Sequence, residues 1–199
     1  MKKIVIATKN PGKAKEFEMI FADYQVETLL DHPEMADIEE NGRSFLENAG
    51  IKARTAAQAL GEIVIADDSG LSVDALDGAP GIYSARYAGP EKSDAANRIK
   101  LLEELQDVDP SKRQAAFHCV LVVAGANGEI LADYEGKLEG EILTEERGTN
   151  GFGYDSLFYV PSKGMTTAEM TAEEKAAISH RGQALAALQE DLDQGKLKL

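Results

Sequence analysis

Residues 62–71 read EIVIADDSGL, an apolar run that leads directly into two adjacent aspartates. The apolar residues 63–66 predict a strand buried on both faces of a sheet. This strand is expected to end at residue 66 and to deliver Asp67 and Asp68 at its carboxyl end. Because adjacent buried carboxylates repel each other and lose hydration, the pair should need a positively charged partner.

Helical and strand patterns alternate along the chain around this stretch. One helix should begin after Ser44, which has capping-box spacing to Glu47, and end at Gly61. Its buried stripe is predicted to contain Leu46, Ala49, Ala53, Ala57 and Leu60. Other helices are predicted at about 14–22, 93–106 (with Ile99, Leu102 and Leu105 inward), 171–178 and 183–192, and other strands at 3–7, 117–124 and 157–160, with two more around Gly136 within 129–143. The alternation predicts an α/β fold with a parallel or mixed sheet.

Length, charge and cysteine content limit the classes of protein to consider. The chain has 199 residues, enough for one hydrophobic core, and we expect a single domain over residues 1–199. A formal net charge of −14 argues against nucleic acid and anionic membranes as partners. The first apolar run, residues 4–7, is too short for a signal peptide or a membrane span. A single cysteine, Cys119, excludes an internal disulfide, and together these features predict a cytoplasmic protein.

The loop TKNPGK, residues 8–13, lies between the first predicted strand and the first predicted helix. Amide groups at a helix N-terminus attract anions, Thr8 and Asn10 can donate hydrogen bonds, and Lys13 adds positive charge. Ligands in α/β folds collect at the carboxyl ends of strands, so we expect this loop and the aspartate pair to share one site. A plain turn with a solvated lysine would explain the same residues.

A second acidic pair, Glu39 and Glu40, could join the aspartates in binding a cation. Oxygen ligands from two or three carboxylates suit Mg²⁺, which keeps several waters and bridges to phosphate oxygens. Such an ion would be the positive partner that the aspartate pair requires. Turn and helix-capping roles explain the same carboxylates equally well from sequence alone.

Two later stretches fit recognition of a planar base. Residues 151–155, GFGYD, combine flexible glycines with two aromatic rings. Residues 179–182, SHRG, follow Lys175 and complete a group of three potential cations in an acidic chain. The simpler explanations are a tight turn with core aromatics and a helix–helix turn with surface basic residues. Together the four stretches are the parts expected of an enzyme that acts on a magnesium-bound nucleoside triphosphate.

Nearly the whole chain resembles the inosine triphosphate pyrophosphatase family. The resemblance rests on the segments ATKNPGKAKEF, EENGRSFLENAGIKA, ADDSGLSVDALDGAPGIYSARYAG, FHCVLVV, GTNGFGYDSLF and EEKAAISHRGQAL. It implies an elongated, two-lobed α/β fold with a long central mixed sheet flanked by helices, an active-site cleft between the lobes, and a homodimer. It also implies hydrolysis of non-standard purine nucleoside triphosphates (ITP, dITP, XTP) to the monophosphate and pyrophosphate, with Mg²⁺ as cofactor and Mn²⁺ as a substitute.

The resemblance also implies roles for individual residues. Asp68 would accept a proton from the attacking water and bind the metal, Lys52 would lie near the phosphates, and Glu39 is favoured over Glu40 as the second metal ligand. The implied substrate-binding residues are Thr8, Lys9, Asn10, Gly12, Lys13, Ser69, Phe152, Gly153, Tyr154, Asp155, Lys175, His180 and Arg181. The visible departure is Ser156, where the family usually has proline, and we expect the serine to loosen one turn and shift the base pocket slightly.

Base selectivity and competing functions follow from the same residues. A pocket that donates to the oxygen at C6 of hypoxanthine or xanthine would reject adenine, which carries an amino donor there; the exclusion of guanine is not explained. Hydrolysis of modified pyrimidine triphosphates, as in Maf-like relatives, and a non-catalytic magnesium–nucleotide sensor stay open. A dinucleotide-binding oxidoreductase is disfavoured, because the first predicted strand is not followed by G-x-G-x-x-G. An enzyme that forms an aspartyl-phosphate is disfavoured too, because it would need Asp-x-Asp, whereas Asp67 and Asp68 are adjacent.

Overall fold

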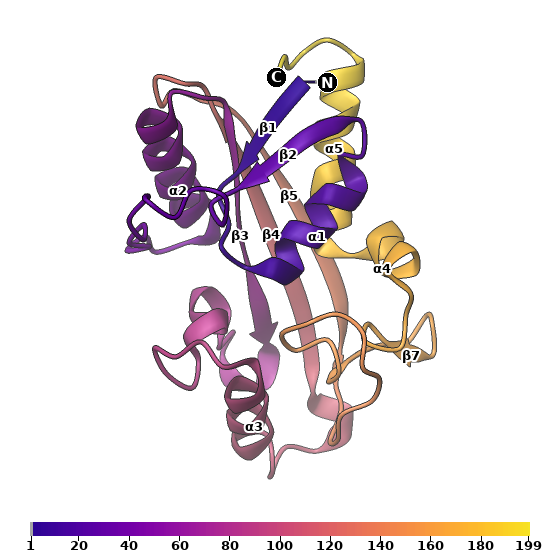
Figure 1. Ribbon diagram of the computed structural model, residues 1–199. Helices are drawn as coiled ribbons and strands as arrows, with labels where there is room; N and C mark the ends of the chain where they lie inside the picture. The colour runs from indigo at the N-terminus through magenta and orange to yellow at the C-terminus, as the bar shows by residue number, and fades with distance from the viewer. Residues whose placement is uncertain (1) are drawn as a thin grey trace. The chain divides into compact units, whose positions relative to one another are not determined.

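The computed structural model describes residues 2–199, and in this range helices flank a seven-stranded sheet with the order β2-β1-β3-β4-β5-β6-β7 (Figure 1). The strands are β1 Lys2–Ile6, β2 Tyr24–Thr28, β3 Val64–Val73, β4 Gln114–Ala124, β5 Ile130–Ile142, β6 Phe158–Val160 and β7 Met165–Thr166. The α-helices are α1 Pro11–Ile20, α2 Phe45–Leu60, α3 Asp94–Glu104, α4 Ala172–Ile178 and α5 His180–Asp193. β1 pairs in parallel with β2 and β3, whereas β6 pairs antiparallel with β5 and β7, so the predicted α/β class with a mixed sheet is confirmed.

The chain divides into two compact units, each assembled from separate stretches of sequence. Unit 1 contains the residues up to Asp68 together with Cys119–Gly136 and Gln183–Leu199, and unit 2 contains Ser69–His118 and Lys137–Gly182. Strands β3, β4 and β5 each contribute residues to both units. This division does not decide whether the chain behaves as one domain, which stays a prediction.

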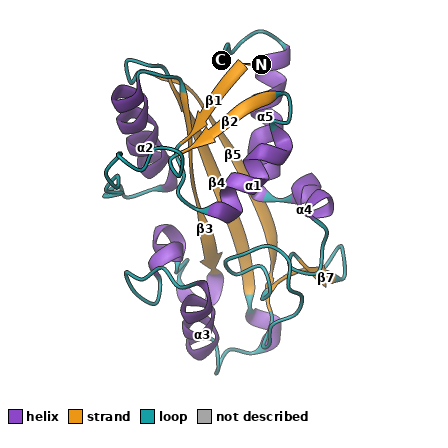
Figure 2. Cartoon of the chain, viewed as in Figure 1, coloured by secondary structure: helices purple, strands orange, loops and turns teal. Residues whose placement is uncertain are grey.

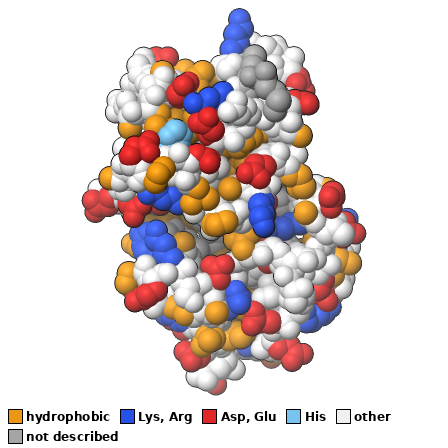
Figure 3. All heavy atoms as spheres, viewed as in Figure 1, with side chains coloured by type: hydrophobic (Ala, Val, Ile, Leu, Met, Phe, Trp, Pro, Cys, Tyr) orange, Lys and Arg blue, Asp and Glu red, His pale blue; other side chains and the backbone are white. Residues whose placement is uncertain are grey.

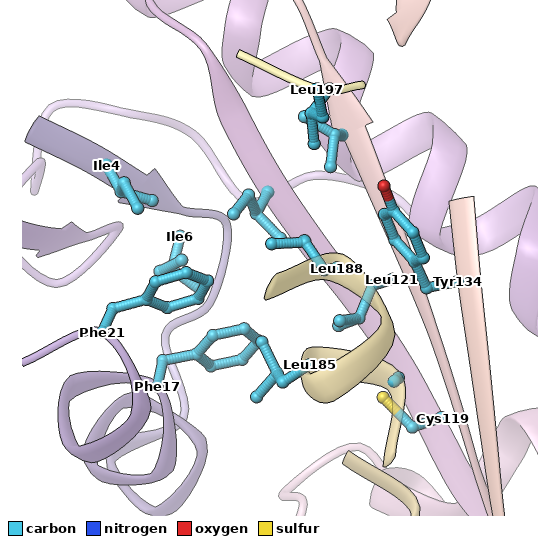
Figure 4. Packing of buried hydrophobic residues seen from close by; sticks show 13 residues of the cluster. Ile4, Ile6, Phe17, Phe21, Cys119, Leu121, Tyr134, Leu185, Leu188 and Leu197 are labelled. Carbon is cyan, nitrogen blue, oxygen red and sulfur yellow. The ribbon is translucent and has the colours of Figure 1, made fainter. Parts of the chain in front are cut away.

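Unit 1 has a hydrophobic core on each face of its part of the sheet. Ile4 and Ile6 of β1 pack in one core with Phe17 of α1 and Leu185 of α5 (Figure 4). Val5, between them in sequence, packs instead in the core formed with α2. This switch from residue to residue is the period of two expected for a strand covered on both faces. The buried residues of β1 therefore fix the loop of residues 8–13 at the carboxyl end of an inner strand of the sheet.

Unit 2 has its own core, which contains Leu71 of β3, Leu101 of α3, Phe117 of β4 and Phe158 of β6. The ring centroids of Phe117 and Phe158 lie 4.2 Å apart. After β5 the chain of this unit runs mostly in loops and turns, with only the short β6 and β7 before α4 (Figure 2). The stretch predicted to recognise a base belongs to this loop-rich region.

Helix α2 shows how local chemistry sets helix ends. Ser44 is its N-cap and accepts a hydrogen bond from the Glu47 amide, and Gly61 ends it at φ 67°, as predicted. The Glu47 carboxylate accepts from the amide of Arg43 at 2.7 Å, so the reciprocal half of the capping box reaches one residue further than expected. Leu46 is 44% exposed, and its predicted place in the buried stripe is wrong. It lies in the first turn, before the alanines through which α2 packs on the sheet.

Three further predictions about elements are wrong. β3 does not end at residue 66 but continues to Val73, so the aspartate pair lies inside a strand. Residues 130–142 form the single strand β5, in which Gly136 makes no turn. On α3, Ile99 is 58% exposed, because Leu101 and Leu105 occupy the face that reaches the core of unit 2. Strands β2 and β7 were not predicted.

The described residues contain no helix with both the length and the apolar character needed to cross a membrane. On the face drawn in Figure 3, acidic, basic and hydrophobic side chains are interspersed.

Candidate functional site

The loop of residues 8–13 is organised by its own side chains at the start of α1. Asn10 is the N-cap, and its Oδ1 accepts hydrogen bonds from the amides of Gly12 at 2.8 Å and Lys13 at 3.2 Å. Thr8 Oγ1 accepts from the Asn10 amide at 3.1 Å. In these bonds Thr8 and Asn10 act as acceptors, while the hydroxyl hydrogen of Thr8 and the side-chain NH₂ of Asn10 are the donors that the predicted anion site requires.

The two lysines of this loop contact separate carboxylates. Lys13 Nζ lies 3.1 Å from Asp67 Oδ2, so the predicted proximity of the loop and the aspartate pair is confirmed, although the pair lies inside β3. Lys9 Nζ lies 2.6 Å from Asp37 Oδ1 and donates to the carbonyl of Met35 at 3.2 Å. Lys9 therefore ties the loop after β1 to the segment that follows β2.

Asp68 has a weaker positive partner than Asp67. Lys52 Nζ lies 3.6 Å from Asp68 Oδ1 and 3.0 Å from Glu40 Oε2. The other oxygen of Asp68, Oδ2, is buried and has no hydrogen-bond partner among residues 2–199. Burial raises the pKa of Asp68 to about 6, against the opposing effect of Lys52 and Lys13. Asp68 is therefore a buried carboxylate with one oxygen available to a further group.

Lys52, which is buried, and Lys13, which is half-buried, are the positive partners that the aspartate pair was expected to need. Burial lowers the pKa of Lys52, but the carboxylates of Asp68, Asp67 and Glu40 outweigh burial and raise it above its usual value. Lys52 consequently stays charged, and it neutralises part of the acidic pair from one side while Lys13 does so from the other.

The donor set of unit 1 fits a hard cation in type. Carboxylate oxygens are the ligands that Mg²⁺ prefers, and the unpartnered Oδ2 of Asp68 is the atom best suited to such a contact. Glu40 lies close enough to contribute to the pKa of Asp68, whereas Glu39 is exposed. Within residues 2–199 no three His, Cys, Asp or Glu side chains form a ready-made metal cluster. The assignment of Glu39 as a metal ligand stays a prediction.

In unit 2 the residues expected to recognise a base converge on Asp155. Its Oδ2 accepts hydrogen bonds from Lys175 Nζ at 2.7 Å and from the Phe152 amide at 3.0 Å, and its Oδ1 accepts from the Thr167 hydroxyl at 2.9 Å. Gly151 has φ +72°, and a Cβ there would lie 2.1 Å from Asp155 Oδ2. Glycine is therefore needed at 151 for the loop to close over this carboxylate.

The two aromatic rings of this loop have different environments. The Phe152 ring is half-buried, and Lys175 Nζ lies 4.7 Å from its centroid. Tyr154 is buried in the core of unit 2, and its hydroxyl donates to the carbonyl of Ser84 at 2.7 Å. Gly153, at φ +60°, connects them. Phe152 is thus the ring positioned for stacking, and Tyr154 anchors the loop.

His180 and Arg181 form the start of α5, and both are buried, so the simpler reading of them as surface residues is wrong. The His180 ring stacks on Phe117 with centroids 4.8 Å apart. Arg181 is 2% exposed and donates from Nη2 to Ser69 Oγ at 2.9 Å. Ser69 is the residue after Asp68, so Arg181 fixes the chain directly beside the buried carboxylate.

Several residues that contact the predicted site were missed by the sequence analysis. Asp37 binds Lys9, Thr167 binds Asp155, and Ser84 accepts from Tyr154. Each is distant in sequence from its partner and lies in no recognisable motif. Glu40, the alternative to Glu39, is the acid that reaches Lys52.

Comparison with known proteins gives a consistent result over nearly the full length. Residues 4–191 match the model of the Ham1 family. A protein of Listeria monocytogenes serovar 1/2a named dITP/XTP pyrophosphatase is 57% identical over 194 residues, which cover 96% of this chain and 95% of that protein. A protein of the same name from Halalkalibacterium halodurans is 52% identical over 195 residues, covering 97% of this chain and all of that protein.

Solved structures agree with these matches. The Ham1 protein of Staphylococcus aureus has a TM-score of 0.85 and 47% sequence identity, covering 98% of this chain and 100% of that chain. A HAM1 protein from Coxiella burnetii has a TM-score of 0.86 and 45% identity with the same coverage.

Proposed function

Because this chain belongs to the Ham1 family and is similar to proteins named dITP/XTP pyrophosphatase, we propose that it hydrolyses non-standard purine nucleoside triphosphates. The proposed substrates are ITP, dITP and XTP, and the products are the nucleoside monophosphate and pyrophosphate. Such an enzyme would remove these nucleotides from the precursor pool. The observation that supports the proposal most directly is the buried, unpartnered Oδ2 of Asp68 beside two charged lysines.

The loop of residues 8–13 and Lys52 would hold the triphosphate. Lys13 and Lys52 are charged, buried to a large extent and paired with carboxylates, so phosphate oxygens can replace these partners as anions of the same sign. The N-terminus of α1 and the remaining donors of Thr8 and Asn10 would add hydrogen bonds. Positive charge at the phosphates stabilises the departing pyrophosphate.

Asp68 would take the proton of the attacking water. Its Oδ2 is free of hydrogen bonds within the described structure, and water attack on the α-phosphorus needs an acceptor at this point. Asp68, with Glu39 or Glu40 as a second carboxylate, would also hold Mg²⁺ or Mn²⁺, which supplies charge neutralisation at phosphate oxygens and lowers the pKa of water.

The residues of unit 2 would recognise the base. Phe152 offers a half-buried ring for stacking, and Lys175, His180 and Arg181 are candidate donors to an oxygen at C6 of the purine. Adenine presents an amino group at C6, so donor would face donor and the site would reject it. The homodimer and the cytoplasmic location implied by the resemblance belong to the same proposal.

A kinetic panel tests this function. We expect kcat/KM for ITP, dITP and XTP to exceed that for ATP and GTP by at least about 100-fold, with pyrophosphate rather than phosphate released. EDTA should abolish turnover, and added Mg²⁺ or Mn²⁺ should restore it. Equal kcat/KM for all five nucleotides would refute the base selectivity. Preference for a modified pyrimidine triphosphate would favour the Maf-like alternative, and nucleotide binding without pyrophosphate release would favour the sensor.

A further inference from the structure

We propose that Asp94 and Arg98 of α3 are positioning residues for residues 151–155, the base-recognition loop. The Gly153 amide donates to Asp94 Oδ2 at 2.9 Å, and Arg98 Nη1 donates to the Gly153 carbonyl at 2.8 Å. One turn of α3 therefore holds both backbone groups of a single loop residue. The inference rests on the proposed function, because it assumes that this loop binds a purine.

The position of Asp94 and Arg98 on α3 makes this contact rigid. Residues four apart in a helix lie on the same face, one turn above the other. Leu101, in the following turn of α3, and Leu105, its C-cap, continue this same face and are fully buried in the core of unit 2. α3 can therefore transfer the rigidity of the core to the loop, which has little regular structure of its own (Figures 1 and 2).

A second contact holds Arg98 and the end of the loop together. Arg98 Nε forms an ion pair with Glu146 Oε1 at 2.5 Å, and the same oxygen accepts the hydroxyl hydrogen of Ser156 at 2.6 Å. Ser156 is the residue directly after Asp155. Proline at this position would restrict the backbone through its fixed φ but would have no hydroxyl to donate. Ser156 instead restrains the end of the loop through its hydrogen bond to Glu146.

The geometry indicates what the four residues Asp94, Arg98, Glu146 and Ser156 do for base recognition. Gly153 lies between Phe152, whose ring is available for stacking, and Tyr154, which is anchored in the core. Releasing Gly153 would let Phe152 move without disturbing Tyr154. The loss should therefore fall on binding of the base and leave binding of the phosphates intact.

Binding and kinetic measurements on Arg98→Gln and Asp94→Ala test the inference. IMP reports on the base, and inorganic tripolyphosphate reports on the phosphate site. We expect Kd for IMP and KM for ITP to rise about tenfold in each variant, while Kd for tripolyphosphate changes by less than about twofold and kcat by less than about threefold. Glu103→Ala is the matched control, because Glu103 is an exposed acid on the same helix, and it should leave all four quantities unchanged.

Amide hydrogen exchange of residues 151–155 gives a readout that does not need activity. We expect exchange about tenfold faster in Arg98→Gln than in wild type, and a smaller increase in Ser156→Ala, which perturbs the fold least. Unchanged exchange in both variants, or equal weakening of IMP and tripolyphosphate, would overturn the inference. A wild-type protein that hydrolyses no purine triphosphate would sink the proposed function, whereas the exchange result would still decide the positioning role of α3.

Discussion

Asp68 in unit 1 and Asp155 in unit 2 are both buried carboxylates near a buried lysine, with exposures of 6% and 4%. Asp155 accepts hydrogen bonds from Lys175, the Phe152 amide and Thr167, and its lysine lies at 2.7 Å. Asp68 has its lysine at 3.6 Å, and its Oδ2 has no hydrogen bond within the part of the chain that the structure describes. Burial alone therefore does not separate the structural carboxylate of Asp155 from the carboxylate of Asp68 that we propose to be reactive, whereas the number of donors around each oxygen does.

The two aspartates should affect stability in opposite directions. A buried polar group without a hydrogen bond costs about 1–3 kcal/mol, and more if charged. Burial raises the pKa of Asp68 to about 6 from an ordinary value of 3.8, so ionisation of this carboxyl is less favourable in the folded protein than in the unfolded chain. Its contribution to stability is complete below pH 3.8 and is lost as the pH rises through about 6. Asp155, in contrast, is fully supplied with donors and should stabilise the loop that surrounds it.

The largest effect is expected from Asp68→Asn. Loss of the proton acceptor should lower kcat for ITP at least about 1000-fold, since a positioned base contributes up to about 10⁴. The Asn variant removes a buried negative charge, so the free energy of unfolding at pH 7 should stay equal or increase. Steady-state kinetics and urea unfolding measure the two quantities. Near-normal turnover in this variant would remove Asp68 from the mechanism and end its contrast with Asp155.

The second effect is expected from Asp155→Ala, and it falls on stability. The change removes the acceptor of three hydrogen bonds and the nearest carboxylate of a buried ammonium, which should lower the free energy of unfolding by about 3–5 kcal/mol. Urea unfolding measures the loss. Thr167→Val is the graded control, because it removes one of these bonds and should cost about 1 kcal/mol. A loss for Asp155→Ala no larger than that control would show that Asp155 is not the structural centre of the loop.

Much of the fold could be predicted because its signals are local. The continuous apolar run of β1 is readable as a strand covered on both faces, and the ends of α2 follow from the hydroxyl of Ser44 and the left-handed backbone of Gly61. The true end of β3 could not be read, because two charged residues inside a strand contradict the hydrophobic pattern by which strands are recognised. Those charges are tolerated only because lysines from other segments neutralise them.

The candidate site could also be predicted only in part, where its contacts follow from local sequence signals. The predicted proximity of the loop of residues 8–13 to Asp67 is confirmed by the Lys13–Asp67 ion pair, although Asp67 lies inside β3 and not at its end. The partners Asp37 and Arg98 could not be predicted, because their contacts join segments distant in sequence and leave no periodic signal. His180 was expected near the base, but its burial against Phe117 depends on packing that sequence does not encode locally.

A third, smaller effect concerns the two lysines that pair with these carboxylate groups. We expect Lys13 to exchange Asp67 for a phosphate group, whereas Lys175 stays paired with Asp155. Lys13→Met should raise Kd for inorganic tripolyphosphate about 10- to 30-fold, because one charge-assisted contact to phosphate is lost. Isothermal titration calorimetry measures the change. Lys15→Met is the matched control, since Lys15 is exposed on the same helix and should leave Kd unchanged. Equal Kd for both variants would mean that Lys13 serves Asp67 as a structural partner, much as Lys175 serves Asp155.

The smallest effect concerns Glu146, whose Oε1 is contacted by Ser156 and Arg98. It therefore has fewer donors than Asp155 and more than the Oδ2 of Asp68. The Ser156 hydroxyl is the main cause that holds the pKa of Glu146 below its usual value, and Arg98 adds to it against the effect of burial. The folded-state pKa is depressed, so this contribution to stability is present above pH 4.5 and is lost as the pH falls through the folded value. Ser156→Ala should therefore raise the pKa of Glu146 towards 4.5 and reduce stability at pH 6 more than at strongly acidic pH.

Carboxyl-carbon NMR titration of Glu146 measures this shift directly, and Ser111→Ala is its matched control. Ser111 donates to Asp109 in the same way and holds the pKa of that carboxyl down, so its removal should move Asp109 and leave Glu146 unchanged. If Glu146 titrated identically in wild type and Ser156→Ala, donor number would not set the behaviour of this carboxylate. The difference between Asp68 and Asp155 would then have a physical cause other than the number of donors around each carboxylate.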